Sequence, residues 1–400
     1  MNIIFLTLIH IDDVNKGFVY TDLMRRFRDD GHQVYIVSAC ERRLGLITSI
    51  VENNGVKILN VKTMNIQKTN IIEKGIGTVL LENQFKKAIK KYLNGIKFDL
   101  ITYSTPPITL TNVVKYLKKK SPNAISYLQL KDIFPQNAVD MGMFSNKSLF
   151  YWYFRRKEVA LYKNSDFIGC MSSANVEFVI KHNSDYPQER VEVAPNSIEL
   201  PNKATLSDEQ KKEIKLKYGL PIDKPIFIYG GNLGKPQGID YLISCLELNK
   251  KRTDCFFLIV GSGTDYHKIK KWYDNNNGTN VKLLEKLPME DYDLVVRSCD
   301  VGLIFLDHRF TIPNYPSRLL SYISNKIPVL CATDVNTDIG KIAEENGYGY
   351  WCESKDPSDF TMLVDKILQS DITAMGERGF QFLKENYLVD NTYNVIMNHF

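Results

Sequence analysis

Continuous hydrophobic runs, each followed by a polar turn and an amphipathic stretch, recur along the first half of the chain. The apolar runs lie at 2–8, 33–39, 98–104, 124–130 and 166–172. After the first run, Val19, Leu23 and Phe27 are four residues apart and form one face of a helix. Strands rich in Val, Ile, Leu and Phe without alternation are buried on both faces, so the pattern predicts a parallel sheet flanked by helices.

The pattern pauses at 195–224, which is polar and rich in proline, with one predicted helix over 207–218. It resumes with apolar runs at 225–230, 255–261, 280–285, 299–306 and 327–332. The tail, about 371–400, predicts two helices that separate near Asn386–Asp390. We expect an α/β fold of two doubly wound domains, divided into an N-terminal domain (1–200), a linker region (201–224), a C-terminal domain (225–385) and a final helix (386–400) that packs back on the first domain.

Composition excludes several classes of protein. The chain has 400 residues, of which 24% are charged and 11% aromatic, and this argues against disorder. It has no run of 18 apolar residues, and its N-terminus is typical of a buried strand rather than a signal peptide. Seven scattered cysteines without a C-x-x-C pair favour reduced thiols in a cytoplasmic protein. The six histidines show no metal-ligand spacing, so we expect no metal.

Charge is unevenly distributed. Residues 1–200 hold 27 Lys and Arg against 19 Asp and Glu, whereas residues 201–400 hold 24 against 27. A basic half indicates an anionic partner, either nucleic acid or lipid headgroups. Because the chain has no helix-turn-helix, RNA-recognition or zinc pattern, we do not expect nucleic acid to be the partner.

One basic segment is also aromatic. Residues 143–163 combine six consecutive or near-consecutive rings with Arg155, Arg156 and Lys157, and the stretches 84–97 and 113–120 add lysines. This combination suits an anionic membrane surface, with rings at headgroup level and cations on the lipid phosphates. The alternative is an ordinary core helix with a solvated basic face.

Ligands of doubly wound domains bind in the crevice at the carboxyl ends of the strands, so the loops after strands carry the candidate chemistry. Gly17 precedes a predicted helix and could offer a backbone N–H to an anion, although a plain loop glycine is the alternative. The segment 229–240 has four glycines with Asn232, Gly234 and Lys235, which suits a phosphate cradle or a flexible turn. Gly261 and Gly263 follow the next strand and lack the third glycine of a dinucleotide fingerprint, so only some nucleotide is indicated.

Two further loops carry charged side chains. Arg318 falls in the first turn of a predicted helix that Ser317 could cap, where a cation is unfavourable unless an anion binds; a solvated arginine is the alternative. Asp132 follows the strand at 124–130 and would face the crevice, or else cap a short helix.

Collected in order, these segments resemble family 4 retaining glycosyltransferases of the GT-B fold. The resembling segments are GHQVYIVSA (31–39), KDIFPQNAVDMG (131–142), VAPNSIEL (193–200), LIVGSGTD (258–265) and PSRLLSYISNKIPVL (316–330). The second of these is similar to a bacterial branch that builds capsules and O-antigens and includes N-acetylfucosaminyl transferases. The similarity covers almost the whole chain.

The resemblance implies a reaction. A UDP-sugar, with an N-acetylated or deoxy-amino sugar, would bind the second domain, and a polyprenyl-diphosphate-linked saccharide at the inner membrane face would bind the first. Transfer would proceed with retention and without a cofactor or metal. Gly17 would contact the diphosphate, Arg318 or Lys235 would supply positive charge, and Asp132 would orient the acceptor or share a proton. Further donor contacts are expected from residues of the second domain, namely Asn232, Gly234, Gly261, Gly263, Asn314, Tyr315, Pro316, Ser317, Ser321 and Asp338.

The chain departs from the family at four positions. Asn232 and Gln237 stand where the family has Arg and Lys, and Pro313 and Ser321 stand where it has paired glutamates. The segment 332–340, with Asp338, is a candidate source of replacement contacts. Two alternatives follow: a sugar-nucleotide epimerase of the same architecture, and a non-catalytic, transferase-like partner subunit. The expected location is the cytoplasm, peripheral on the inner face of the cell membrane.

Overall fold

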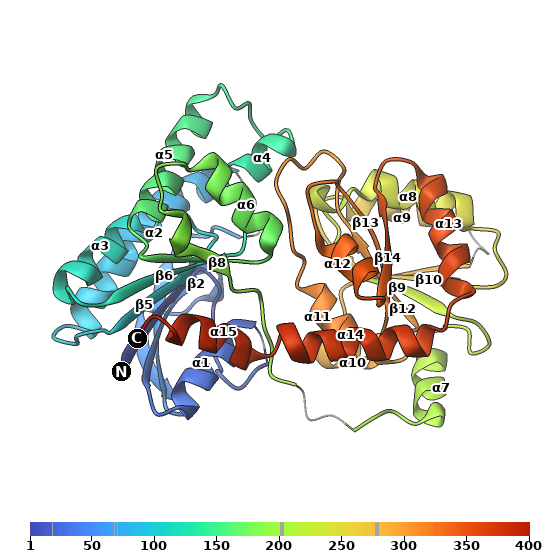
Figure 1. Cartoon of the computed structure of the whole chain (residues 1–400), viewed down its shortest axis with the longest axis horizontal. Helices are drawn as coiled ribbons and strands as arrows, with labels where there is room; N and C mark the ends of the chain where they lie inside the picture. Colours follow the sequence, from blue (N-terminus) through green and yellow to red (C-terminus); the bar gives the residue numbers. More distant parts are fainter. Residues whose placement is uncertain (18, 68, 70, 201–203, 277–279) are drawn as a thin grey trace. The chain divides into compact units, whose positions relative to one another are not determined.

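The computed structural model describes the chain apart from residues 18, 68, 70, 201–203 and 277–279. It consists of two compact units (Figure 1). Unit 1 comprises Met1–Glu199 together with Leu388–Phe400, and unit 2 comprises Leu200–Tyr387. The chain therefore crosses between the units twice, at 199/200 and at 387/388. Part of the predicted linker region, 201–203, lies outside the described residues.

Unit 1 is built on an eight-stranded sheet of order β3-β4-β2-β1-β5-β6-β7-β8, parallel except for the β3–β4 pair. The five predicted strands are present, and β3, β4 and β8 were not predicted. The strands are β1 (Asn2–Thr7), β2 (Gln33–Glu41), β3 (Ser49–Asn53), β4 (Val56–Thr63), β5 (Leu100–Ser104), β6 (Ile125–Leu130), β7 (Phe167–Cys170) and β8 (Val191–Val193).

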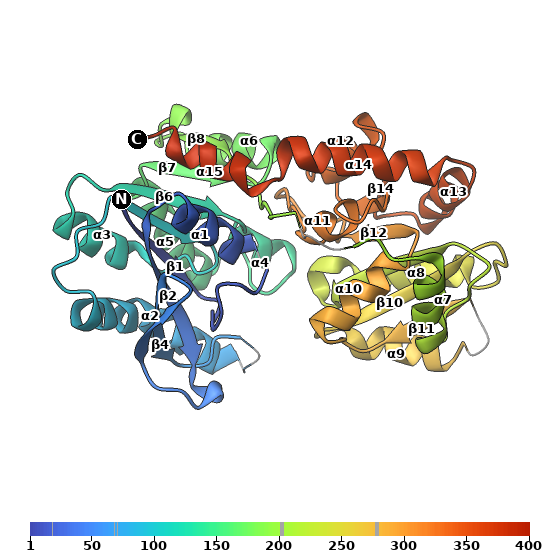
Figure 2. The same cartoon turned by 90° about the horizontal axis from the view of Figure 1, so that it is seen from below.

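Helices cover this sheet. α1 packs against α15, which lies beside it in both views (Figures 1 and 2), while α3 packs against α2 and α5. Serine N-caps begin α5 and α6, where Ser148 and Ser172 accept backbone N–H groups. The helices are α1 (Val19–Asp29), α2 (Ile71–Tyr92), α3 (Thr111–Lys120), α4 (Gln136–Asp140), α5 (Leu149–Lys163), α6 (Ser173–His182) and α15 (Val389–Met397), with short 3₁₀ turns at Arg42–Leu44 and Gln188–Arg190.

Unit 2 has a six-stranded parallel sheet of order β11-β10-β9-β12-β13-β14. The five predicted strands are again present, and β14 is additional. The strands are β9 (Ile226–Asn232), β10 (Phe256–Ser262), β11 (Val281–Leu284), β12 (Val301–Phe305), β13 (Val329–Thr333) and β14 (Gly349–Glu353).

The helices of unit 2 pack in pairs, α8 with α13 and α11 with α14. The predicted helix of the linker region is α7, which a Ser207 capping box opens and which packs on α10 within unit 2. The predicted break in the tail is confirmed between α14 and α15. The helices are α7 (Asp208–Lys217), α8 (Ile239–Asn249), α9 (Tyr266–Asp274), α10 (Met289–Arg297), α11 (Arg318–Ile323), α12 (Ile339–Glu345), α13 (Pro357–Leu368) and α14 (Ile372–Asn386), with a 3₁₀ turn at Lys235–Gln237.

Each sheet has a topological switch point, where successive crossovers leave the first strand in opposite directions. In unit 1 it lies between β1 and β5, and in unit 2 between β9 and β12. Ligands of open α/β sheets bind outside the carboxyl ends of the strands at such points. None of the described helices is long and apolar enough to cross a bilayer.

Candidate functional site

The switch point of unit 2 is formed by the loops that follow β9 and β12. These loops touch: the backbone N–H of Asp307 donates to the carbonyl of Pro236 at 3.0 Å. Gly238 has a φ of +59°, and a Cβ there would lie 3.3 Å from the Cα of Asp307. Glycine therefore suits both the backbone conformation and the close approach of the two loops.

Gly261 and Gly263 serve the packing of these loops. A Cβ at Gly261 would stand 2.0 Å from the carbonyl oxygen of Gly231, and one at Gly263 would stand 2.2 Å from that of Leu233. Either contact would push the end of β10 away from β9. The local geometry thus accounts for both glycines without a ligand, and their predicted donor contacts stay a prediction.

Arg318 begins α11, as predicted, but its side chain turns under the end of β9. Its Cζ lies 4.4 Å from the ring centroid of Tyr229, and Nη2 is 3.4 Å from the place of a Cβ at Gly231. The Nη1 atom is buried and has no hydrogen-bond partner among the described residues. The guanidinium is thus partly shielded from solvent, and its predicted contact with an anion stays a prediction.

The surroundings of Arg318 hold no described carboxylate within ion-pair distance. The nearest loop carboxylate in sequence, Asp307, already accepts two hydrogen bonds of 2.8 Å from Arg309. The guanidinium lies over the phenol ring of Tyr229 instead of against a carboxylate. A guanidinium remains protonated inside a protein, so this side chain is a partly buried cation whose Nη1 has donor capacity to spare.

Lys235 is exposed at the start of the 3₁₀ turn after β9 and forms no ion pair with a described residue. The two amides of the same loop bind each other: Asn232 Nδ2 donates to Gln237 Oε1 at 2.8 Å. That oxygen also accepts from the backbone N–H of Gly234 at 3.4 Å. The neutral residues that replace the family's cations therefore brace the loop.

The loop before α11 is tied into the fold. The Tyr315 hydroxyl bonds to the Tyr387 hydroxyl, and the backbone N–H of Asn314 donates to Thr337 Oγ1 at 3.0 Å. Ser317 precedes α11 without a side-chain capping bond, so the predicted cap is wrong: its backbone already has helical φ and ψ. Pro316 lies between them, partly buried.

Ser321 and Asp338 are the remaining predicted donor contacts. Ser321 accepts bonds on its carbonyl from Ser324 and Asn325 inside the helical turn. Asp338 precedes α12 without capping it. The carboxylate of Asp334, four residues earlier, is hydrogen-bonded within the loop: it accepts from the backbone N–H and from the hydroxyl of Thr337. Burial raises the pKa of Asp334 to about 6.

Asp132 lies at the carboxyl edge of the sheet in unit 1, directly after β6. Burial raises the pKa of its carboxyl to about 6. Burial raises the pKa of the Tyr20 phenol, in α1, to about 12. A hydrogen bond with the Ser104 hydroxyl lowers this pKa, and the negative charge of Asp132 raises it, so the Asp132 carboxylate lies near the phenol. Three elements, α1, β5 and β6, thus converge beside the switch point of unit 1.

Sequence reasoning did not commit to three neighbours of this carboxylate. Tyr20 and Ser104 come from the first turn of α1 and the end of β5, and Lys131 precedes Asp132. Burial lowers the pKa of Lys131 to about 7. His10, which follows β1, has a buried Nδ1 with no hydrogen-bond partner in the described part of the chain. Ser104, Lys131 and His10 share a signal in the sequence, their place at or just after a strand end, whereas Tyr20 lies in the first turn of α1.

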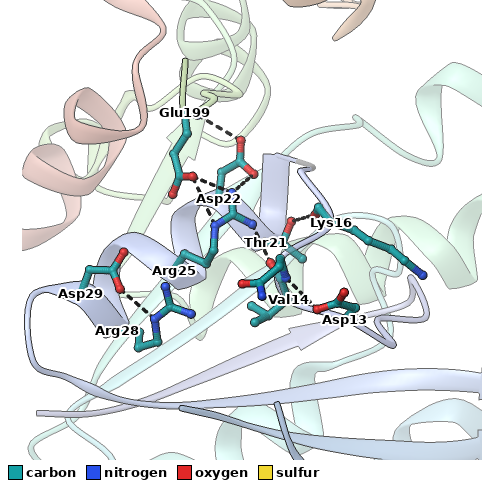
Figure 3. Close-up of polar contacts among 10 residues, drawn as sticks. Asp13, Val14, Lys16, Thr21, Asp22, Arg25, Arg28, Asp29 and Glu199 are labelled. Carbon is teal, nitrogen blue, oxygen red and sulfur yellow. Dashed lines mark hydrogen bonds and ion pairs between the residues drawn. The ribbon is translucent and has the colours of Figure 1, made fainter. Parts of the chain in front are cut away.

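Gly17 is exposed just ahead of α1, with open space where a Cβ would stand. The loop that carries it is anchored by Arg25, a buried arginine of α1 (Figure 3). Arg25 Nη1 donates to the Val14 carbonyl at 2.5 Å, and Nη2 lies 2.7 Å from carboxylate oxygens of both Asp22 and Glu199. Glu199 is the last residue before unit 2, so one guanidinium fixes the loop, the helix and the first chain crossing.

Within the described residues, no group of three or more His, Cys, Asp or Glu side chains could hold a metal ion.

Residues 210–380 match the family described as "Glycosyl transferases group 1". The match lies within unit 2 and spans both loops of its switch point, so the similarity to group 1 glycosyltransferases includes the candidate donor site.

Three similar proteins illustrate the likeness. The chain is 23% identical over 323 residues to "Probable glycosyltransferase WbjE" of Pseudomonas aeruginosa, covering 80% of this chain and 78% of that protein. It is 22% identical over 159 residues to "Putative colanic acid biosynthesis glycosyl transferase WcaI" of Escherichia coli K12, covering 39% and 38%. The solved structure of Anabaena Alr3699/HepE in complex with UDP and glucose superposes with a TM-score of 0.72 at 14% identity, covering 100% of this chain and 99% of that one. The last likeness concerns the fold alone, and with the two parallel sheets it confirms the predicted GT-B class.

Proposed function

We propose that this protein is a retaining glycosyltransferase that moves an N-acetylated or deoxy-amino sugar from UDP to a saccharide carried on a polyprenyl diphosphate. The proposed setting is capsule or O-antigen synthesis at the inner face of the cell membrane, in a branch similar to N-acetylfucosaminyl transferases. The group 1 domain and the names of the relatives support sugar transfer in polysaccharide synthesis. The UDP and glucose named for the Anabaena structure support a nucleotide-sugar donor.

The observation that carries the proposal is the partly buried guanidinium of Arg318 near the switch point of unit 2, whose Nη1 is buried and has no hydrogen-bond partner among the described residues. A buried cation without a carboxylate partner is unfavourable by itself, and a bound diphosphate would satisfy it with charge-assisted hydrogen bonds. Lys235 adds a second, exposed cation on the loop after β9.

In the proposed reaction, the bond from the sugar's anomeric carbon to the diphosphate oxygen breaks, and a bond to an acceptor hydroxyl oxygen forms on the same face of the sugar. The negative charge that develops on the diphosphate is stabilised by Arg318 and Lys235. As the new bond forms, the proton of the acceptor hydroxyl passes to the departing diphosphate oxygen or to the carboxylate of Asp132. We assign Asp132 to orient that hydroxyl or share its proton, because a carboxyl whose pKa is about 6 can do either near neutral pH. The proposal needs no metal or cofactor.

A non-catalytic partner subunit is the second candidate, and one observation favours it. Asn232 and Gln237 stand where the family has cations, and their amides are bound to each other. A donor site that relied on those two positions would be lost. The relatives reported above are named transferases, so the epimerase alternative is not favoured.

The test is thermal unfolding with UDP, with GDP and without nucleotide, each in EDTA. A ligand at 100 times its Kd stabilises by about 2.7 kcal/mol, which is a shift of a few degrees for domains of this size. We expect a shift with UDP that exceeds the shift with GDP, followed by transfer from a panel of UDP-sugars to a lipid-linked acceptor. No shift with either nucleotide would contradict the proposed donor site and favour the non-catalytic subunit.

A further inference from the structure

The first turn of α5 and the loop before it expose a contiguous set of large apolar side chains. Their exposed fractions are 88% for Leu149, 69% for Phe150 and 65% for Trp152, and Met143 and Tyr153 are also exposed. Single exposed apolar residues are ordinary on a soluble protein, but a cluster of large ones marks a surface that binds something.

The helix is anchored to unit 1 by its second half, where Glu158, Leu161 and Tyr162 are buried, and by the partly buried Phe154. The Phe154 ring lies 5.0 Å from that of Phe134, and the buried Glu158 carboxylate binds both Arg155 and the Tyr162 hydroxyl. The outward positions Leu149, Trp152, Tyr153 and Arg156 follow the i, i+3, i+4, i+7 spacing of one helical stripe. The outward stripe of α5 therefore carries apolar and aromatic side chains at positions where a solvated helix face would carry polar ones.

The charged residues of this stretch are cations. Residues 141–157 contain four Lys and Arg and no Asp or Glu. Arg155 and Lys157 lie against the carboxylates of Glu158 and Glu82, whereas Lys147 and Arg156 are exposed beside the apolar side chains and form no ion pair with a described residue. The helices α2 and α3 extend the basic surface; their exposed lysines are Lys74, Lys87, Lys90, Lys91, Lys115, Lys119 and Lys120. An apolar stripe framed by cations is complementary to a lipid surface that carries anionic headgroups.

We propose that Leu149, Phe150 and Trp152 insert into the headgroup region of an anionic bilayer, with Lys147 and Arg156 on the lipid phosphates. The indole ring suits this depth because it has an apolar body and a polar N–H. Membrane binding itself is independent of catalysis. It rests on the proposed function only for its purpose: the same chain segment leads from Asp132 to α5, so binding here would bring a lipid-linked saccharide to the edge of unit 1 that carries Asp132.

The test is co-sedimentation of the full chain with vesicles, without nucleotide. One set is phosphatidylcholine alone, and the other contains about 30% phosphatidylglycerol, a cytoplasmic-leaflet level of negative charge. We expect the wild type to bind the anionic vesicles at least about tenfold more tightly, with a blue shift of Trp152 fluorescence. The double variant Leu149→Ser/Trp152→Ser should lose at least about tenfold in binding. Leu248→Ser, which removes an isolated exposed leucine of α8, is the matched control and should bind as the wild type does.

Charge reversal separates the two parts of the surface. Lys147→Glu/Arg156→Glu should remove the preference for anionic vesicles, by roughly fivefold per cation lost, and should abolish its sensitivity to salt. Wild-type protein that ignores both vesicles, or a Leu149→Ser/Trp152→Ser variant that binds normally, would overturn the proposal. The UDP thermal shift of each variant keeps the two proposals apart: a normal shift without vesicle binding contradicts only the membrane surface, and vesicle binding without a shift contradicts only the donor site.

Discussion

Each unit places an arginine near a switch point, Arg25 buried and Arg318 partly buried, and the two guanidinium groups differ in their partners. In unit 1, Arg25 binds two carboxylates and a backbone carbonyl, and it is only 8% exposed. In unit 2, Arg318 lies over a phenol ring with Nη1 buried and unpartnered, and no described carboxylate is within ion-pair distance. Desolvating a cation is unfavourable unless its donors find acceptors.

This difference separates a structural arginine from a binding one. Arg25 has its acceptors in the folded chain, so its role is complete without a ligand: it holds the loop before α1 and the segment that ends at Glu199. Arg318 lacks them, so the fold carries an unfavourable group that a bound anion would satisfy. A polar group that lowers the stability of the folded state until a ligand binds is typical of a binding site.

Replacement of Arg25 by Ala should give the largest effect, and it should be an effect on stability. Removing the guanidinium leaves Asp22 buried without a cation, which costs about 3–5 kcal/mol when a buried pair is broken. Chemical denaturation measures this loss. Lys16→Ala is the control, because the Lys16–Asp12 pair lies on the surface with both side chains about 60% exposed, and its loss should change little. Equal losses for the two variants would refute the structural assignment of Arg25.

Arg318→Met should behave in the reverse manner. A side chain of similar length without charge removes the buried, unsatisfied group, so the free energy of unfolding should stay the same or rise. Transferase activity should fall by about 10²–10³, the usual effect of losing one group that stabilises charge in the transition state. Lys341→Ala, which removes an exposed cation of the same unit, is the control for net charge. A destabilised Arg318→Met with normal activity would reverse the comparison.

Asp132→Asn tests the carboxylate of unit 1. We expect a loss of roughly 10² in kcat, the scale of general acid–base assistance. Because the pKa of Asp132 is about 6, wild-type activity should rise as pH increases through 6, and this limb should vanish in the variant. Asp185→Asn, at an exposed carboxylate, should keep both the rate and the limb.

Stability gives an independent readout of the same carboxyl. Its folded pKa of about 6 exceeds the ordinary value of 3.8, so the folded state holds the proton more tightly and loses stability as pH rises from about 4 to above 6. Asp132→Asn should therefore gain more stability over the wild type at pH 8 than at pH 4. A gain that does not depend on pH would contradict the raised pKa.

The smallest effect is expected from Asn232→Ala/Gln237→Ala. These amides bind each other, so their loss should loosen the loop after β9 and change donor KM by only about threefold, the scale of one net hydrogen bond. Titration of the donor at saturating acceptor measures this change. A complete loss of binding would mean that the two amides, rather than Arg318 and Lys235, hold the diphosphate.

The sequence predicted the strands that are continuous apolar runs and missed four others. Of those, β3 is largely exposed, β8 has three residues and β14 begins at Gly349. The fourth, β4, is an inner strand of eight residues, but polar residues interrupt its apolar run (VKILNVKT). A strand that pairs on one side only carries a weaker hydrophobic signal. The helical tail was found because both of its helices keep an apolar face.

The sequence selected candidate site residues by their place in the fold. Asp132 was selected because it follows a strand, and Arg318 because it falls in the first turn of a predicted helix. The surroundings of Arg318 were not visible, because Tyr229 and Gly231 approach it from a strand almost ninety residues earlier. Likewise, Gly261 and Gly263 resemble a nucleotide loop in sequence, but the atoms that demand glycine there belong to the neighbouring strand and its loop. Long-range packing of this kind leaves no local pattern.

The central claim is that the Arg318 guanidinium binds the diphosphate of a nucleotide-sugar donor. Calorimetric titration with UDP and with uridine, both in EDTA, tests this claim most directly. Wild-type protein should bind UDP about 10–100 times more tightly than uridine, because hydrogen bonds to a charged group contribute about 1.5–3 kcal/mol. Arg318→Met should lose most of this preference and keep its affinity for uridine. Equal affinity of the wild type for UDP and uridine, or an unchanged preference in Arg318→Met, would contradict the account.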